Sequence, residues 1–192
     1  KAPIRCGVEV KEVRRNVGRP GFRIETSDGI FEANNVVAAT GPFQCPLIPD
    51  FKFENNRITQ IHSSQYHNPN QLPEGGVLVI GAGSSGAQIA DELLRAGKSV
   101  HLSVGPHDLP PRSYRGRDFV WWLGVLGKWE AVTKDPGTEH ITIAVSGAHG
   151  GQTVDFRGLA ERGIILLGRT HSVKKNVIRF EPDLAKNIAN GN

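Results

Sequence analysis

The feature of this sequence that most limits its fold is a short apolar run, residues 77–80, followed at once by residues 81–86 with the spacing G-x-G-x-x-G. The run contains only valine, leucine and isoleucine, which is typical of a parallel strand covered on both faces. The glycine spacing turns a strand into a helix and leaves backbone N–H groups facing a diphosphate. The pattern predicts a dinucleotide-binding turn. The alternative is a glycine-rich turn that serves packing alone.

The residues after the turn fit the same interpretation. Residues 84–96 have apolar side chains at helical spacing and end at Gly97, and residues 99–104 resemble a second strand. This order is that of a strand–helix–strand unit. We therefore expect the nucleotide diphosphate to contact the turn itself, at Gly81, Gly83, Ser84, Ser85 and Gly86.

The first part of the chain has a different pattern. Residues 7–15, 22–26 and 30–32 alternate apolar and polar side chains, Asp28-Gly29 is a hairpin turn, and residues 36–40 resemble a short buried strand. We predict an α/β fold: a Rossmann-like NAD(P)-binding domain with a parallel sheet, plus a partial antiparallel β-meander from an FAD-binding domain. The expected divisions are 1–45 for the meander and the strand ending in Ala39-Thr40-Gly41, 46–75 for a connector, and 76–192 for the nucleotide-binding domain.

Further elements are expected within the last of these divisions. Asp118 is a candidate N-cap for a helix over 119–126, which is apolar nearly all round and is therefore expected to be buried or to face an interface. The remaining predictions are strands at 141–145 and 164–167, a helix at 153–162, a hairpin at 172–180 and a terminal helix at 183–189.

Composition narrows the class of protein. The net charge is only +4 and hydrophobic residues make up 38% of the chain. No apolar run approaches the ~20 residues that cross a bilayer, and no basic helix points to nucleic acid, so neither partner is expected. Cys6 and Cys45 match no redox or zinc spacing and the seven histidines are scattered, so no metal and no disulfide framework are predicted. We expect a cytoplasmic protein, and we identify no catalytic nucleophile or base.

The residues after the second strand favour NADPH over NADH. An acid about 20 residues after the glycine turn would bind the ribose 2′-hydroxyl of NAD, but Ser103 occupies that place and no acid follows until Asp108. Ser103 is predicted to donate to the 2′-phosphate. The positive charge would come from Arg112, Arg115 or Arg117, with Arg112 preferred because it is nearest in sequence. Each of these arginines could equally be a solvated loop cation.

Three segments together resemble the class B flavoprotein monooxygenases, which include flavin-containing and Baeyer–Villiger enzymes and related bacterial oxidoreductases. They are Ala39-Thr40-Gly41, His62-Ser63-Ser64-Gln65-Tyr66 and the glycine turn. The resemblance implies FAD and NADPH as cofactors, backbone contact of Thr40 and Gly41 with FAD, and a place for His62 and Ser63 on the NADP side. The alternatives are a strand-ending turn at residue 40 and a structural histidine at residue 62.

Two departures from that family bear on the prediction. Asn56 and Ile58 stand where the family fingerprint has Phe and Gly, and the family's first G-x-G-x-x-G is absent. The chain also contains no methionine. We therefore expect an internal fragment of a longer protein, which does not bind FAD by itself.

The predicted function is the NADPH-binding part of an FAD-dependent, monooxygenase-like oxidoreductase, in which NADPH reduces flavin that then activates oxygen. The substrate is expected to be a small molecule, the oligomeric state is open, and this piece alone is expected to be inactive. One alternative is a pyridine nucleotide-disulfide reductase, which needs a redox cysteine pair that Cys6 and Cys45 do not supply. Another is a non-catalytic NADP(H)-binding module.

Overall fold

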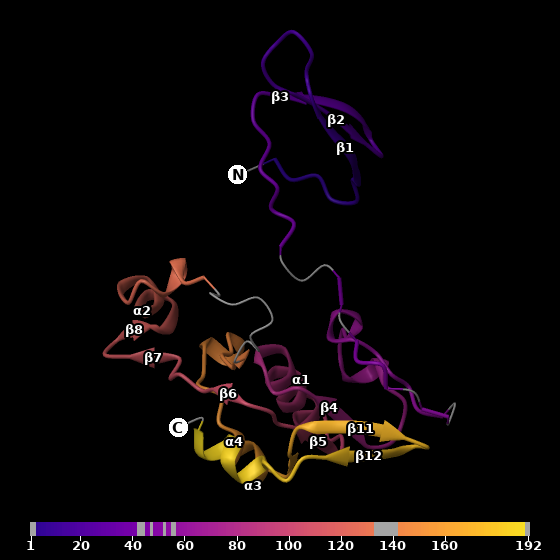
Figure 1. Cartoon of the computed structure of the whole chain (residues 1–192), viewed down its shortest axis with the longest axis vertical. Helices are drawn as coiled ribbons and strands as arrows, with labels where there is room; N and C mark the ends of the chain where they lie inside the picture. The colour runs from indigo at the N-terminus through magenta and orange to yellow at the C-terminus, as the bar shows by residue number, and fades with distance from the viewer. Residues whose placement is uncertain are drawn as a thin grey trace. The chain divides into compact units, whose positions relative to one another are not determined.

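The structure is a computed structural model of the 192-residue chain, and it describes residues 3–41, 45–46, 48–51, 53–54, 57–132 and 142–190. The chain divides into two compact units, residues 1–45 and residues 46–192 (Figure 1). The mixed α/β fold class is confirmed. The assignment of the two units to FAD-binding and NADPH-binding domains stays a prediction.

The first unit is an antiparallel meander of three strands. They are β1 (Val10–Arg15), β2 (Phe22–Thr26) and β3 (Gly29–Ala33), in the order β1-β2-β3. The Thr26 hydroxyl closes the β2–β3 turn, because it donates to Gly29 O at 2.8 Å and accepts the Asp28 N–H at 3.1 Å. The meander expected from the alternating pattern is therefore confirmed.

The short buried strand expected at residues 36–40 does not form. Residues 34–41 belong to no strand or sheet, and Val37 is 85% exposed. A strand is stabilised by a hydrogen-bonded neighbour, and no described strand pairs with this segment. The apolar composition of residues 36–39 was the only basis for the prediction, and composition alone does not supply a partner.

The second unit is built on a parallel sheet of three strands. β4 (Val77–Ile80) leads into α1 (Ser84–Arg95), which returns to β5 (Val100–Ser103), and β10 (Ile165–Leu167) pairs with the other side of β5. The order β10-β5-β4 places β5 in the centre. The predicted strand–helix–strand unit is confirmed, and α1 ends at Ala96 before Gly97, whose φ is +77°.

The burial of the strands follows their order in the sheet, with the central strand β5 most buried. Val100, Leu102 and Val104 are fully buried and form the core with Leu93 of α1 and Phe156. β4 is an edge strand of the described sheet, so Ile80 is 45% exposed. The expectation of a strand covered on both faces was therefore wrong for β4, although it describes β5.

A second group of elements follows β5 along the chain. β6 (His107–Asp108) pairs in parallel with β9 (Thr142–Ile143), and β7 (Ser113–Tyr114) forms a hairpin with β8 (Arg117–Asp118). α2 (Phe119–Val125) begins at the predicted cap, where Asp118 Oδ1 accepts the Val120 N–H at 2.8 Å. η3 (Lys128–Glu130) comes after it. Of the two alternatives expected for α2, burial is not observed, because Trp121 is 45% and Val125 58% exposed, and an interface stays a prediction.

The remaining elements complete the second unit. They are the short turns η1 (Ser63–Gln65), η2 (Pro69–Gln71) and η4 (Ala148–Gly150), then α3 (Phe156–Glu161), the hairpin β11 (Thr170–Lys174) and β12 (Val177–Phe180), and α4 (Leu184–Asn190). The expected hairpin and terminal helix are confirmed. α3 begins three residues later than predicted, and β9 covers only part of the predicted strand, whose first residue lies outside the described residues. Among the described helices, none has the length and apolar character that crossing a membrane requires.

Candidate functional site

The glycine turn between β4 and α1 is shaped by a close approach of two backbone segments. A β-carbon placed on Gly86 would stand 1.9 Å from the carbonyl oxygen of Gly81 and 3.6 Å from Cγ1 of Val79. Gly81 itself has a φ of +100°, which favours glycine. The turn therefore requires glycine at its first and third glycine positions, and it brings the start of α1 directly onto the end of β4.

This arrangement fits a diphosphate. The first N–H groups of a helix have no intrahelical acceptor, and the helix dipole favours negative charge at the same end. Ser85 lies in this first turn and is exposed, while Gly83 occupies the N-cap position without a side chain. A diphosphate at this place would meet backbone N–H groups and the exposed Ser85 hydroxyl.

The hydroxyl of Ser84 has a structural role. It donates to Ile143 O and accepts the Val145 N–H, both at 3.1 Å, so it attaches the chain after β9 to the first turn of α1. Gln88 adds a longer contact from Nε2 to Val145 O at 3.5 Å. Of the groups of Ser84, the backbone N–H is the one left for a diphosphate.

Ser103 lies in the core and not on an open surface. It is 2% exposed, its hydroxyl donates to Gly168 O at 2.9 Å, and it accepts the Thr170 hydroxyl at 2.8 Å. A serine has one hydroxyl hydrogen, and here that hydrogen is already donated. Ser103 therefore connects β5 to the chain after β10, and the expected donor to a 2′-phosphate has to be another residue.

Arg112 is also engaged within the protein. Its Nη2 lies 2.8 Å from Asp118 Oδ2, its backbone N–H donates to Thr153 Oγ1, and its Nε is buried against Gly151. Among the described residues, this buried Nε has no hydrogen-bond partner. The contacts of Arg112 join the β7–β8 hairpin to the segment after η4.

The other two arginines proposed for the 2′-phosphate are stacked on aromatic rings. Arg115 lies over Tyr114 at 5.2 Å from the ring centroid, and Arg117 lies over Trp121 at 5.3 Å. In Figure 1 the β7–β8 hairpin and α2 are set apart from the turn between β4 and α1. The structure does not bring these arginines together with the glycine turn.

His62 and Ser63 form a capped turn in the connector. The Nδ1 atom of the His62 ring accepts the Ser64 N–H at 3.2 Å, and the backbone N–H of His62 donates to Gln65 Oε1 at 3.2 Å. The hydroxyl of Tyr66 donates to Glu92 of α1 at 2.9 Å. The segment 62–66 is thereby fixed to α1, while Ser63 is exposed.

Thr40 and Gly41 belong to the first unit, whereas all other predicted site residues belong to the second. Both are exposed in the segment that follows the meander, and Gly41 has a φ of +78°. This segment offers no cradle comparable with the Gly81–Gly86 approach. The described residues therefore do not fit FAD binding by this chain alone.

One residue that sequence reasoning missed is Arg169. It follows β10, is exposed, and lies beside Gly105 at the end of β5, where a β-carbon on Gly105 would be 3.6 Å from its Cγ. The sequence places Arg169 two residues after a predicted parallel strand. It does not show that Arg169 lies beside the end of a different strand, β5.

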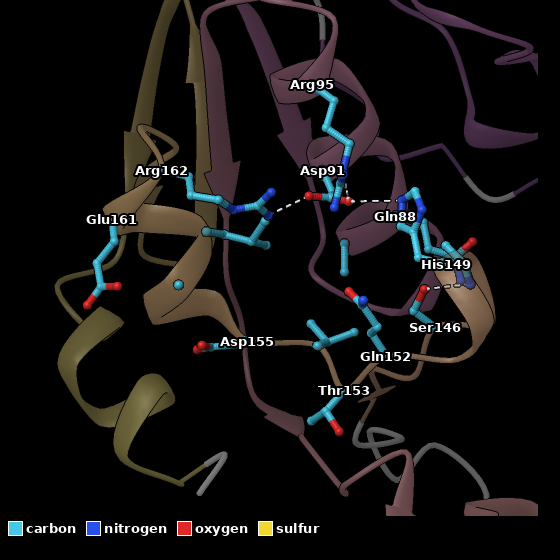
Figure 2. Close-up of a pocket in the computed structure, with 15 residues that line it drawn as sticks. Gln88, Asp91, Arg95, Ser146, His149, Gln152, Thr153, Asp155, Glu161 and Arg162 are labelled. Atoms are coloured by element: carbon cyan, nitrogen blue, oxygen red, sulfur yellow. Dashed lines mark hydrogen bonds and ion pairs between the residues drawn. The ribbon is translucent and has the colours of Figure 1, made fainter.

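A cavity of about 390 Å³ lies between α1, η4 and α3 (Figure 2). Asp91 stands at its wall between Arg162 and His149, with Arg95 one turn further along α1. Partial burial opposes ionisation of Asp91, but hydrogen bonds from Arg162 and Arg95 outweigh it and hold its pKa below the ordinary value. None of residues 81–86 lines this cavity. The ion pair between Asp91 and Arg162 at the wall of this cavity joins α1 to the end of α3.

The described residues contain no group of three or more His, Cys, Asp or Glu side chains placed to hold a metal. Cys6 and Cys45 are both free and exposed. Neither observation identifies a catalytic group among the described residues.

The family of the chain follows from comparison with known proteins. A family model described as pyridine nucleotide-disulphide oxidoreductase matches residues 1–115, which is more than half of the sequence. The chain belongs to this family. The description of this family includes the disulfide reductases, which were the predicted alternative. The individual relatives are therefore needed to tell which kind of oxidoreductase the chain resembles.

The relatives are oxidoreductases and flavin-containing monooxygenases. An uncharacterized CzcO-like oxidoreductase of Geobacillus kaustophilus is 48% identical over 109 residues, covering 55% of this chain and 31% of the relative. The CzcO oxidoreductase of Bacillus subtilis is 32% identical over 181 residues, covering 88% and 49%. The flavin-containing monooxygenase iboF of Amanita muscaria is 31% identical over 132 residues, covering 65% and 24%. The resemblance inferred from the motifs is confirmed.

A solved structure agrees on the fold. A mutant flavin monooxygenase from Stenotrophomonas maltophilia superimposes with a TM-score of 0.51 at 21% identity, covering 92% of this chain and 48% of its own. The chain therefore spans half or less of the length of the proteins it matches.

Proposed function

We propose that this chain is the NADPH-binding part of an FAD-dependent, monooxygenase-like oxidoreductase that acts on a small molecule. The observation that carries the proposal is the approach of Gly86 to Gly81 at the start of α1. That approach forms a cradle for a diphosphate at the carboxyl end of a parallel strand. The names of the flavin-containing relatives support the choice of reaction class.

When bound, the nicotinamide supplies a hydride and the flavin supplies the oxygen chemistry. The residues of this chain bind and orient. The first turn of α1 holds the diphosphate through N–H groups, and Ser84 keeps the segment after β9 attached to that turn. Tyr66 keeps the connector on α1 through Glu92. No side chain needs to act as a nucleophile or a general base.

The competing disulfide-reductase activity is less well supported. It requires a pair of cysteines that exchange with a disulfide, and the two cysteines of this chain are 39 positions apart in sequence, at 45 and 6. We also propose, from composition and charge, that nucleic acid and membranes are not partners. The free cysteines support a reducing, cytoplasmic location.

The first test is the binding of NADPH to the 192-residue chain, measured by isothermal titration calorimetry with ADP-ribose and free nicotinamide as comparison ligands. Saturable binding of NADPH and ADP-ribose, with no binding of nicotinamide alone, is expected because the diphosphate and adenosine meet the sheet edge. Absence of binding to all three would contradict the nucleotide site.

The second test uses the longer protein that contains this chain. Its visible spectrum is expected to show a flavin band that bleaches when NADPH is added, followed by consumption of oxygen. A protein that cannot be loaded with FAD would favour the non-catalytic binding module. Reduction of a disulfide substrate without oxygen uptake would favour the disulfide reductase.

A further inference from the structure

Large apolar side chains gather at the surface around α2 and η3, in a part of the chain that Figure 1 shows apart from the turn between β4 and α1. Within residues 114–130, six of them are at least 43% exposed: Tyr114, Val120, Trp121, Val125, Leu126 and Trp129. We call these six side chains the α2 patch. Neither α2 nor η3, both wholly described by the structure, has a buried residue. Contiguous exposed apolar groups of this kind mark a surface that binds another molecule.

The patch is held together by contacts among its own side chains. The Trp122 ring links two of them, because its centroid lies 5.7 Å from that of Tyr114 and 4.8 Å from that of Trp121. Its Nε1 also donates to Tyr114 O at 3.0 Å. Trp129 folds back onto α2, where a β-carbon on Gly124 would lie 3.3 Å from its Cδ1 and Nε1. The patch is therefore a fixed surface, which a partner does not have to order on binding.

Two arginines give this surface a positive charge. Arg115 lies over the Tyr114 ring at 5.2 Å from the centroid, and Arg117 lies over the Trp121 ring at 5.3 Å. A guanidinium that lies over a ring still has the N–H groups in its own plane to donate to other acceptors. Within the part of the chain that the structure describes, neither guanidinium is paired with a carboxylate. Both are exposed and can meet an acidic group from outside.

The acidic residues near the patch do not cancel this charge. Asp118 is engaged within the protein, because its carboxylate pairs with Arg112 at 2.8 Å and accepts the Val120 N–H at 2.8 Å. Of the charged residues between 119 and 130, Lys128 adds a positive charge and Glu130 a negative one. The surface is thus positive, and it is complementary to carboxylates.

We propose that the α2 patch binds an acidic segment of a partner protein, in which apolar side chains alternate with carboxylates. The apolar side chains of that segment cover the aromatic rings of the patch, and its carboxylates accept hydrogen bonds from Arg115 and Arg117. Tryptophan, tyrosine and arginine are the residue types that contribute most to binding at protein interfaces. The surface is separate from the glycine turn, so this proposal does not depend on nucleotide binding.

Three other occupants fit the patch less well. A second copy of this chain would bring the arginines of both copies into one interface, since a two-fold contact pairs a patch with itself, and like charges repel. A helix that lies in a membrane surface carries a charged face, whereas α2 contains no charged residue. Single-stranded nucleic acid stacks its bases on aromatic rings, but Arg115 and Arg117 already cover faces of two of these rings.

The test uses tryptophan fluorescence, because all three tryptophans of the chain, Trp121, Trp122 and Trp129, lie in or beside the patch. The probe is an end-capped peptide in which glutamate alternates with leucine, so it has no aromatic residue of its own. Titrated into the 192-residue chain, it is expected to change the emission saturably, and raised salt is expected to weaken its binding. Peptides with lysine in place of glutamate, or serine in place of leucine, are expected to bind at least about tenfold more weakly.

Variants at exposed side chains separate the two contributions. Arg115→Ala together with Arg117→Ala is expected to weaken binding of the glutamate–leucine peptide about fivefold or more, since two charge pairs are lost. Leu126→Ser changes a side chain that is 63% exposed and is expected to weaken binding about tenfold, because apolar burial is lost.

Matched controls lie on β12. Arg179→Ala removes an exposed arginine, and Val177→Ser removes an apolar side chain that is 57% exposed. Each is expected to change binding of the peptide less than about twofold. Thermal unfolding followed by circular dichroism checks that all variants are folded, and equal effects of the folded control and patch variants would overturn the proposal.

The other outcomes also decide the proposal. It is overturned if the glutamate–leucine peptide leaves the emission unchanged or binds no better than the lysine–leucine peptide. A response to oligothymidylate, or to vesicles of phosphatidylcholine and phosphatidylserine, without a response to the peptide would assign the patch to nucleic acid or lipid instead. A wild-type dimer that Leu126→Ser converts to a monomer in sedimentation equilibrium would assign it to a second copy. Loss of peptide binding in the longer protein that contains this chain would show that the rest of that protein covers the patch, which overturns the proposal as well.

Discussion

The α-carbon of Gly86 faces the carbonyl oxygen of Gly81 so closely that a methyl group at residue 86 would lie 1.9 Å from that oxygen. The two residues are five positions apart, and they join the end of β4 to the first turn of α1. Neither the backbone of the strand nor that of the helix can move without disturbing the sheet. This contact determines where the N–H groups of the helix point.

Gly86→Ala is expected to be strongly destabilising. The added methyl group has no space, so α1 has to move away from β4 at a cost of about 1–3 kcal/mol in the free energy of unfolding. Binding of NADPH should be lost as well. Urea unfolding and calorimetry measure the two effects.

The matched control is Gly76→Ala, where the nearest atom to an added β-carbon is Ser99 O at 3.9 Å. That change is expected to alter stability by less than about 0.5 kcal/mol. Equal effects of the two substitutions would show that the crowding at Gly86 is not the cause.

Ser84→Ala is expected to detach the chain after β9 from the start of α1. The hydroxyl serves Ile143 O and the Val145 N–H, and its removal leaves both partly buried groups without it, at a cost of about 1–3 kcal/mol. Hydrogen exchange of the Val145 amide should become faster. Ser85→Ala, at the exposed neighbour, should leave that exchange rate unchanged, and faster exchange in both variants would contradict the prediction.

Ser103→Ala is expected to lower stability without changing nucleotide preference. It leaves the Gly168 carbonyl and the Thr170 hydroxyl without their partner in the core, which costs about 1–3 kcal/mol. The ratio of NADP⁺ to NAD⁺ affinity should equal that of the wild-type chain. A selective loss of NADP⁺ binding would restore Ser103 as the phosphate ligand.

Tyr66→Phe is expected to cost about 0.5–1.5 kcal/mol at neutral pH, because the bond to Glu92 is lost while the ring still packs. Burial, followed by the hydrogen bond to Glu92 and its charge, raises the pKa of Tyr66 above its ordinary value of 10.0. The unfolded chain therefore releases this proton first as the pH rises. The stability that Tyr66 contributes is complete below pH 10 and falls above it.

Urea unfolding of wild type and Tyr66→Phe across that range should show the difference between them shrinking above pH 10. Tyr114→Phe changes the other tyrosine of the chain, which is exposed, and is the control. A constant difference at all pH values would argue against the role of the Glu92 contact.

Asp91→Asn is expected to loosen α1 from α3. The carboxylate pairs with Arg95 at 2.8 Å and with Arg162, and its loss should cost about 1–3 kcal/mol at neutral pH. Burial raises the pKa of Asp91, but the two arginines outweigh it and lower the value below the ordinary 3.8. The contribution is thus present above pH 3.8 and is lost as the pH falls through the lower folded value.

Acid unfolding checks this prediction, since the wild type and Asp91→Asn should converge below pH 3.8. Glu74→Gln is the control: Glu74 is fully exposed and lies 3.6 Å from Lys98. An exposed pair of this kind contributes little. If both substitutions cost the same, the helix-joining role of Asp91 is wrong.

Local patterns predicted the elements well where the pattern and its partner lie close in sequence. The strand, glycine turn and helix at 77–96, the Asp28-Gly29 hairpin and the Asp118 cap were all predicted, because their contacts span few residues. The strand expected at 36–40 was wrong, and α2 is not buried within this chain, because both features depend on surfaces that local sequence does not describe. The place of Ser103 in the core was missed for the same reason.

The sequence by itself predicted the glycine turn that follows β4, where only glycine allows the backbone of residue 86 to meet that of residue 81. Only the tertiary structure decided which side chains surround this turn. Ser103 meets Gly168 across 65 residues, and Gly105 meets Arg169 across a similar separation. Both contacts depend on the pairing of β10 with β5. Contacts between residues so far apart in the sequence produce no local pattern from which they could be predicted.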